Sequence, residues 1–106
     1  MTVEYHPLTV SDLNNAVSYY NRQRPGLGDE LRSEVYSAIE RVGANPYQFA
    51  IIKNHIRRAF VHRFPYAVLF RIVNEDTIRL LVIAIIDVIR ILDSAANSIS
   101  SRLVTF

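Results

Sequence analysis

The sequence predicts an α+β fold in which an N-terminal strand and a helical hairpin pack on a curved antiparallel sheet. Residues 9–45 place apolar side chains at helical spacing, in two stretches separated by Arg24-Pro25-Gly26. Residues 56–86 instead hold three runs rich in β-branched and aromatic residues. Because each helix exposes an apolar stripe on its own, we expect both stripes to cover the sheet.

The N-terminal elements are a short strand and a first helix. Residues 2–6 alternate, with Val3 and Tyr5 pointing one way, and Pro7 ends the strand. A helix then begins near residues 9–11, where Thr9 or Ser11 can cap it. It stops before Pro25, because proline disfavours the α conformation in the preceding residue.

The second helix has the clearest periodicity in the chain. Its apolar stripe comprises Leu27, Leu31, Val35, Ala38, Ile39 and Val42. Residues 43–45 contain Gly and Asn, which permit a left-handed cap, and Pro46 prevents continuation. The two helices therefore form an αα-hairpin joined by a Pro-Gly turn.

The sheet is expected to be an antiparallel meander of residues 56–64, 66–73 and 77–86. Asn74-Glu75-Asp76 is the hairpin loop between the last two strands. The third run reads LLVIAII, apolar at both parities, so this strand should be buried on both faces. Residues 93–106 are Ser-rich, and we expect a loosely packed tail.

Length and composition limit the class of protein. At 106 residues, half of them hydrophobic and 21% charged, the chain should fold as one domain spanning 1–106. The N-terminus lacks the pattern of a secretory signal, and the apolar run 80–92 is interrupted by Asp87 and Arg90. That run is shorter than the ~18 residues of a membrane span. We expect a soluble cytoplasmic protein that does not contact a membrane.

Several kinds of chemistry find no support. Cysteine is absent, which excludes disulfides, thiolate metal sites and a cysteine nucleophile. His6, His55 and His62 are scattered over different elements, so we expect no metal site. The sequence has no nucleophile elbow, phosphate-binding loop or dinucleotide fingerprint, and no cofactor is expected.

Charge is distributed unevenly along the chain. Residues 1–50 contain four Arg against six acidic groups, whereas residues 51–106 contain seven Arg and Lys53 against four. Arginine makes planar, bidentate contacts to carboxylates and phosphates. A solvated basic face is one explanation; an acidic partner surface is the one we favour.

The segment IRRAFVHRFPYAVLFRI, residues 56–72, concentrates this charge. Strand alternation places Arg58 on one face and Arg57 on the other. Basic groups interleaved with aromatics suit RNA or an acidic peptide. We expect Phe60 and Phe70 to be core residues, while Arg57, Arg58 and Arg63 contact a partner.

The order of motifs is also familiar. DLNNAVSYYNRQRPGLGDEL, an Asn-Pro after the second helix, IRRAFVHRFPYAVLFRI and TIRLLVIAII together resemble the RelE/ParE superfamily of type II toxin–antitoxin toxins, over residues 2–90. The resemblance implies a growth-arresting toxin held inactive in a hetero-oligomer with a cognate antitoxin. The antitoxin would lay a helix, and often a strand, across the toxin.

Two mechanisms divide that superfamily. Ribosome-dependent mRNA endonucleases use basic residues on the central strands, often with a late Tyr, but here Ala67 follows Tyr66 and no later Tyr exists. The long first helices and the Arg-Phe-Pro-Tyr corner are similar to the ParE branch, whose members poison DNA gyrase and stabilise plasmids. The resemblance therefore implies a non-catalytic gyrase inhibitor, with an mRNA endoribonuclease acting on the ribosome as the alternative.

The end of the sequence leaves a third possibility open. Asp87 stands where the ParE branch commonly has His, and Ile89 and Arg90 stand where it commonly has paired Arg. An attenuated toxin that only pairs with its antitoxin fits these changes. The residues we expect to contact the target are Arg57, Arg58, Arg63, Tyr66, Arg71 and Arg90, with Tyr66 shaping the corner; catalytic and antitoxin-binding residues are not assigned.

Overall fold

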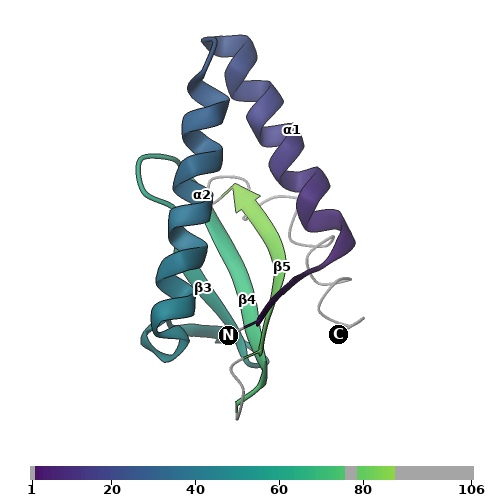
Figure 1. Cartoon of the computed structure of the whole chain (residues 1–106), viewed down its shortest axis with the longest axis vertical. Coiled ribbons are helices and arrows are strands. Elements are labelled where there is room, and N and C mark those ends of the chain that lie inside the picture. The colour runs from purple at the N-terminus through teal and green to yellow at the C-terminus, as the bar shows by residue number, and fades with distance from the viewer. Residues whose placement is uncertain (1, 76–78, 88–106) are drawn as a thin grey trace.

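The computed structural model describes residues 2–75 and 79–87, apart from the side chains of Arg79, Ile83 and Asp87. Its elements, in chain order, are β1 (Thr2–Tyr5), α1 (Pro7–Gln23), α2 (Leu27–Ala44), a 3₁₀ turn (Pro46–Gln48), β2 (Ile51–Lys53), β3 (Ile56–Phe60), β4 (Tyr66–Asn74) and β5 (Arg79–Asp87). The predicted fold class is confirmed, because a helical hairpin lies on one face of a sheet that begins with the N-terminal strand (Figure 1).

The sheet has five strands among the described residues, in the order β1-β5-β4-β3-β2. Strands β3, β4 and β5 are antiparallel neighbours, as the sequence predicts, and β2 also pairs antiparallel with β3. Strand β1 instead pairs with β5 in parallel, which the long intervening chain makes possible. The sheet is therefore mixed, and β1 and β2 lie at opposite ends of it.

The main core lies between the helices and the sheet. Leu31, Val35 and Val42 of α2 are almost completely buried, and their partners include Val68 and Phe70 of β4. Leu80, Val82 and Ile85 of β5 complete the helix-facing surface. Burying one such side chain contributes about 1.5–3 kcal/mol, so the α2 stripe is the principal attachment of the hairpin.

Strand β5 is buried on both faces, which confirms the interpretation of LLVIAII. Leu81, Ala84 and Ile86 belong to a second buried cluster with Ile56, Ala67 and Leu69. The pairing with β4 shifts register between Leu69, opposite Ala84, and Phe70, opposite Val82. This bulge inserts one extra residue into β5, so Val82 and Ile85 both face the helices although three positions separate them.

Helix α1 begins earlier than the sequence predicts. Pro7 is its first residue, and the side chain of His6 accepts a hydrogen bond from the backbone N–H of Leu8 at 3.1 Å. Thr9, one of the two expected caps, is buried inside the first turn, and its hydroxyl donates to the carbonyl oxygen of Val82 at 3.3 Å. Thr9 thus ties α1 to β5.

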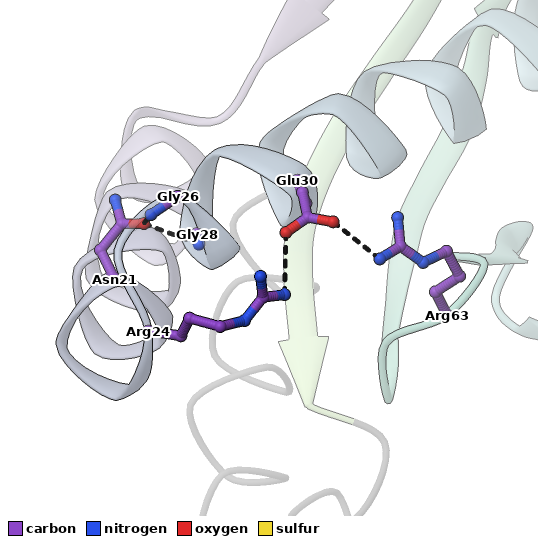
Figure 2. A network of polar contacts seen from close by, with 6 residues as sticks. All are labelled: Asn21, Arg24, Gly26, Gly28, Glu30 and Arg63. Atoms are coloured by element: carbon purple, nitrogen blue, oxygen red, sulfur yellow. Dashed lines mark hydrogen bonds and ion pairs between the residues drawn. The ribbon is translucent and has the colours of Figure 1, made fainter.

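The turn between the helices depends on close contact. Gly26 has φ +90°, a left-handed conformation that glycine adopts without strain. A Cβ on Gly28 would collide with the carbonyl oxygen of Val17 in α1. The side-chain oxygen of Asn21 accepts hydrogen bonds from the N–H groups of Gly26 (3.1 Å) and Gly28 (2.8 Å), as Figure 2 shows.

The strands differ from the prediction at the end of β3 and in the presence of β2. Strand β3 ends at Phe60 rather than residue 64, because residues 61–65 form a corner in which Arg63 has φ 70°. Strand β2 was not predicted; it reaches β3 through the left-handed pair Asn54 and His55. Asp76 of the predicted loop and the tail 93–106 lie outside the described residues.

Within the described ranges, neither helix is sufficiently long and apolar to cross a membrane.

Candidate interface at the basic end of the sheet

One segment of the chain contains several basic residues and no acidic residue. From residue 41 to residue 74 the chain contains no acidic residue, yet it contains Arg41, Lys53, Arg57, Arg58, Arg63 and Arg71. This stretch supplies the end of α2 and the strands β2, β3 and β4. The basic residues of this stretch therefore have no acidic neighbour within it, which leaves a local excess of positive charge.

Arg57 is held by the chain that precedes β2. Its guanidinium donates to the carbonyl oxygen of Phe49 at 2.7 Å, with a longer contact of 3.4 Å to that of Tyr47. The guanidinium carbon lies 5.4 Å from the centre of the Tyr47 ring. Arg57 is opposite Phe70, on the helix-facing side of β3, so its contacts anchor the 3₁₀ turn to the sheet.

Arg58 lies on the other face and is far less constrained. Its guanidinium carbon is 4.5 Å from the centre of the Phe60 ring, and no hydrogen bond to the guanidinium exists among the described residues. Phe60 is 49% exposed, so the expectation that it is a core residue is wrong, whereas Phe70 is fully buried as predicted. The strand pattern marks two faces but not which one is covered.

Exposed apolar side chains also lie on the chain that leads into β2 and on β2 itself. Tyr47, Ile51 and Ile52 are all exposed, and Ile51 lies opposite Arg57 in the sheet. We call the set Tyr47, Ile51, Ile52, Arg57, Arg58 and Phe60 the basic edge. Apolar and aromatic groups mixed with arginine are the residue types that protein–protein contacts favour.

Arg63 occupies the corner after β3 and is bound to α2. Its guanidinium donates to Glu30 Oε1 at 2.9 Å, while Arg24 donates to Glu30 Oε2 at 3.0 Å, as Figure 2 shows. The hydrogen bond from Arg63, together with the charges of Arg24 and Arg63 and the hydrogen bond from Arg24, lowers the pKa of the Glu30 carboxyl. The same contact raises the pKa of Arg63. Arg63 therefore clamps the corner and the helical hairpin together.

Tyr66 begins β4 beside the same corner. It is half-buried, and its ring packs edge-on against Tyr20 of α1, with centres 6.1 Å apart. Tyr20 makes a similar contact with Phe64 at 5.3 Å. The carbonyl oxygen of Tyr66 accepts a hydrogen bond from the N–H of Val61 at 2.9 Å, which closes the corner.

The predicted contact residues thus separate into groups. Arg71 of β4 is half-buried. It lies two residues beyond Leu69, and Leu69 pairs with Arg58. Because side chains alternate along a strand, Arg58 and Arg71 lie on the same face of the sheet. Arg57 lies on the opposite face, while Arg63 and Tyr66 lie at the far end of β3. Arg90 lies outside the described residues. No group of three His, Cys, Asp or Glu side chains with metal-binding geometry occurs in ranges 2–75 and 79–87.

Sequence reasoning missed a pocket of about 180 Å³ between α1 and α2. Its lining includes Leu13 of α1, Val35 and Tyr36 of α2, Tyr5 at the end of β1, and Ile85 of β5. Burial, and then the nearby Tyr36, raises the pKa of the Tyr5 hydroxyl. These residues come from segments distant in the sequence, so no local pattern could have revealed the pocket.

Comparison with known proteins places the chain in a family. The family model described as the ParE toxin of the type II toxin–antitoxin system parDE matches residues 3–95. A solved structure described as the chromosomal ParDE toxin–antitoxin system from P. aeruginosa has a TM-score of 0.71 and 15% sequence identity. That alignment covers 83% of this chain and 96% of the other, and it shows a shared fold. No curated protein matches in sequence. The chain belongs to the ParE toxin family of type II toxin–antitoxin systems.

Proposed function

We propose that this chain is the toxin of a type II toxin–antitoxin module, that it arrests growth by binding DNA gyrase, and that a cognate antitoxin neutralises it. Family membership supports the toxin role. The basic edge supports a protein as the target. Its main feature is Arg58, which stacks on the exposed ring of Phe60. We infer binding without catalysis.

Binding, rather than catalysis, agrees with the chemistry of the central strands. Ala67, directly after Tyr66, is fully buried and has no group that could move a proton. The ring of Tyr66 packs against Tyr20, and Tyr20 also contacts Phe64, so the three rings form one aromatic cluster. By contrast, arginine and large aromatic side chains contribute most of the binding energy in many protein interfaces.

Supercoiling and cleavage-complex assays with purified toxin and gyrase test this proposal. Wild-type toxin should inhibit supercoiling, and Arg58→Ala and Phe60→Ala should each raise the half-inhibitory concentration about 10-fold or more. Arg22→Ala, which removes an exposed arginine of α1 far along the chain from the basic edge, is the matched control and should inhibit like the wild type. No inhibition by wild-type toxin at stoichiometric excess would exclude gyrase as the target.

An mRNA endoribonuclease acting on the ribosome is the second candidate. Arg58 and Arg71 share a sheet face with the exposed Phe60, and a basic surface with an aromatic platform also suits RNA. This candidate predicts mapped mRNA cuts after induction, lost in Arg58→Ala. Intact mRNA in cells whose growth has stopped would reject it.

Growth curves address the possibility that the protein only pairs with its antitoxin. Induction of this chain alone should stop growth, and co-expression of the protein encoded in the neighbouring reading frame should restore it. Unchanged growth after induction of the chain alone, with the protein present on an immunoblot, would identify an attenuated toxin.

A further inference from the structure

The basic edge presents side chains on both faces of the sheet, and the two faces differ in chemistry. Side chains alternate along β3, so Arg57 and Arg58 lie on opposite faces. Ile51 pairs with Arg57 and therefore lies on the helix-facing side. Lys53 pairs with Ile56, which shares the face of Arg58. The register shift between Ile51 and Lys53 produces this change of side within the short strand β2.

The face of the edge that points away from the helices is positively charged. The guanidinium of the half-buried Arg58 stacks on the exposed ring of Phe60, and Lys53 lies on the same side. Within residues 2–75 and 79–87, neither Arg58 nor Lys53 pairs with a carboxylate. A guanidinium held against a ring is partly shielded from water, so an acidic group that approaches it gains a strong contact. This face therefore complements an acidic surface.

The helix-facing side of the edge offers apolar and aromatic contact area instead. Tyr47 and Ile51 are both exposed there. Arg57 links them, because it pairs with Ile51 across the strands and its guanidinium stacks on the Tyr47 ring at 5.4 Å. The same guanidinium donates to the carbonyl oxygen of Phe49 at 2.7 Å, so it already has an acceptor. The accessible groups on this side are therefore the Tyr47 ring and the Ile51 side chain.

The Tyr47 ring is held in place by the structure around it. Besides the contacts with Arg57, the side chain of Gln48 donates to the carbonyl oxygen of Arg41 at 3.3 Å. The ring of Phe49 packs edge-on against the buried Phe70, with centres 5.8 Å apart. An exposed ring on a segment fixed before binding loses little conformational entropy when a partner covers it. Tyr47 is therefore well suited to anchor a partner on this side.

A partner that covers both faces must be concave. Strand β2 is the outermost strand that the structure describes at this end of the sheet, and large exposed side chains lie on both sides of the edge. A flat surface would cover one of these sides only. A groove with two walls would cover Tyr47 on one side and Phe60 on the other, and would remove both rings from water.

Two other occupants fit the edge less well. In a two-fold symmetric dimer the same surfaces would meet, so Lys53 and Arg58 of each copy would face like charges without gaining a carboxylate. The phosphates of a nucleic acid would complement the charged face but would leave Tyr47 and Ile51 without a matching surface. A protein groove complements both faces.

We propose that the basic edge inserts into a groove on gyrase, with an acidic wall that receives Arg58 and Lys53 and an apolar wall that receives Tyr47 and Ile51. This inference rests on the proposed function, because it describes how the edge meets that target. Tyr47 and Arg58 lie on opposite faces of the sheet, so each contacts a different wall. Their contributions to the binding free energy should therefore add.

The test uses the full-length chain, made by cell-free synthesis, and purified gyrase. Their dissociation constant is measured at about 0.05 and 0.3 M salt for the wild type, Tyr47→Ala, Arg58→Gln and the double variant. Each single substitution should weaken binding about 10-fold or more, and the double variant about 100-fold. Arg58→Gln should flatten the salt dependence of binding, whereas Tyr47→Ala should leave it unchanged.

Matched controls come from α1. Tyr19 is an exposed tyrosine and Arg22 an exposed arginine of that helix, and neither belongs to the basic edge. Tyr19→Ala and Arg22→Gln should bind gyrase within about 2-fold of the wild type. A second measurement needs no substitution, because hydroxyl-radical footprinting of the wild-type complex should protect Tyr47 and Phe60 together. If circular dichroism shows that Tyr47→Ala is unfolded, the footprint decides.

The outcomes separate this inference from the function on which it rests. A folded Tyr47→Ala variant that binds as tightly as the wild type, or a Tyr47 ring that stays reactive in the complex, would overturn the groove and leave gyrase as the target. No binding of wild-type toxin to gyrase would overturn both. Binding to DNA alone that Arg58→Gln abolishes and Tyr47→Ala leaves intact would identify a nucleic acid as the occupant. A toxin dimer that Tyr47→Ala dissociates would identify a second copy, and either result contradicts the proposal.

Discussion

At Glu30, one carboxylate accepts hydrogen bonds from two arginines that come from different parts of the chain. Arg24 lies in the turn between the helices, and Arg63 lies in the corner after β3 with a left-handed backbone. A side chain other than glycine in that conformation costs about 1–2 kcal/mol. The contact with Glu30 offsets part of this cost, because the left-handed corner directs the guanidinium toward α2.

The pH dependence of stability should reveal this contact. The pKa of Glu30 is lowered in the folded protein, so its stabilising effect is present above the ordinary pKa of 4.5 and is lost as the pH falls through the lowered value. Glu30→Gln should be less stable than the wild type at pH 7, and the difference should close as the pH falls through the lowered pKa of Glu30. Urea unfolding at the two pH values measures the stability of the variant and of the wild type. The control Glu40→Gln, at an exposed site of α2, should be as stable as the wild type at either pH.

Asn21 should contribute more to the stability of the protein than the exposed residues around it. Asn21→Ala removes the acceptor of two backbone N–H groups in the helical turn, and we expect a loss of about 1–2 kcal/mol in the free energy of unfolding. Asn15→Ala makes the same change in side chain at an exposed site of α1. Equal stabilities of the two variants would contradict the role of Asn21 as acceptor for the turn.

At the scale of elements, β3 places two consecutive arginines in different roles. Arg57 lies on the helix-facing side and binds the chain before β2, whereas Arg58, also half-buried, stacks on the exposed ring of Phe60. Strand alternation predicted the two faces. It could not predict which face would be covered, since that depends on where the helical hairpin lies.

Unfolding measurements should separate the two arginines. Arg57→Ala removes a charged donor from the carbonyl of Phe49 and should lower the free energy of unfolding by about 1.5–3 kcal/mol. Arg58→Ala should change it by less than about 0.5 kcal/mol. If Arg58→Ala were the more destabilising variant, the assignment of Arg57 as the anchor would be wrong.

The elements themselves were predictable to different degrees. Helix α2 has a long, regular apolar stripe, and the structure follows it from Leu27 to Ala44. Strand β2 has three exposed residues and no alternation of burial, so its sequence carries no such signal. The cap of α1 was misplaced because Thr9 serves a tertiary contact with β5 instead.

At the scale of the whole molecule, charge is separated between the two layers. The two helices carry five of the ten acidic residues, and the stretch from residue 41 to residue 74 carries none. The distribution of charge along the sequence was enough to predict this basic half. The pocket could be found only in the folded structure, because its lining residues come from β1, both helices and β5. Sequence reasoning therefore found the charged surface and missed the apolar one.

Ionic strength should weaken the proposed gyrase complex. Raising the salt concentration from about 0.05 to 0.3 M shortens the screening length and should raise the half-inhibitory concentration several-fold. Arg58→Gln should flatten this dependence, whereas Arg22→Gln should not. Inhibition that is independent of salt would contradict a contact dominated by the basic edge.

Strand β2 also affects how the toxin behaves in concentrated solution. Ile51 and Ile52 are 54% and 40% exposed on the outermost strand that the structure describes at that end of the sheet. Such strands template the addition of strands from neighbouring molecules, and a lysine beside them discourages it. The strand ends at Lys53, where the left-handed residues Asn54 and His55 turn the chain. Replacing Lys53 with isoleucine should make the free toxin scatter light at lower concentrations, because the edge strand would lose the charge that opposes the addition of a further strand.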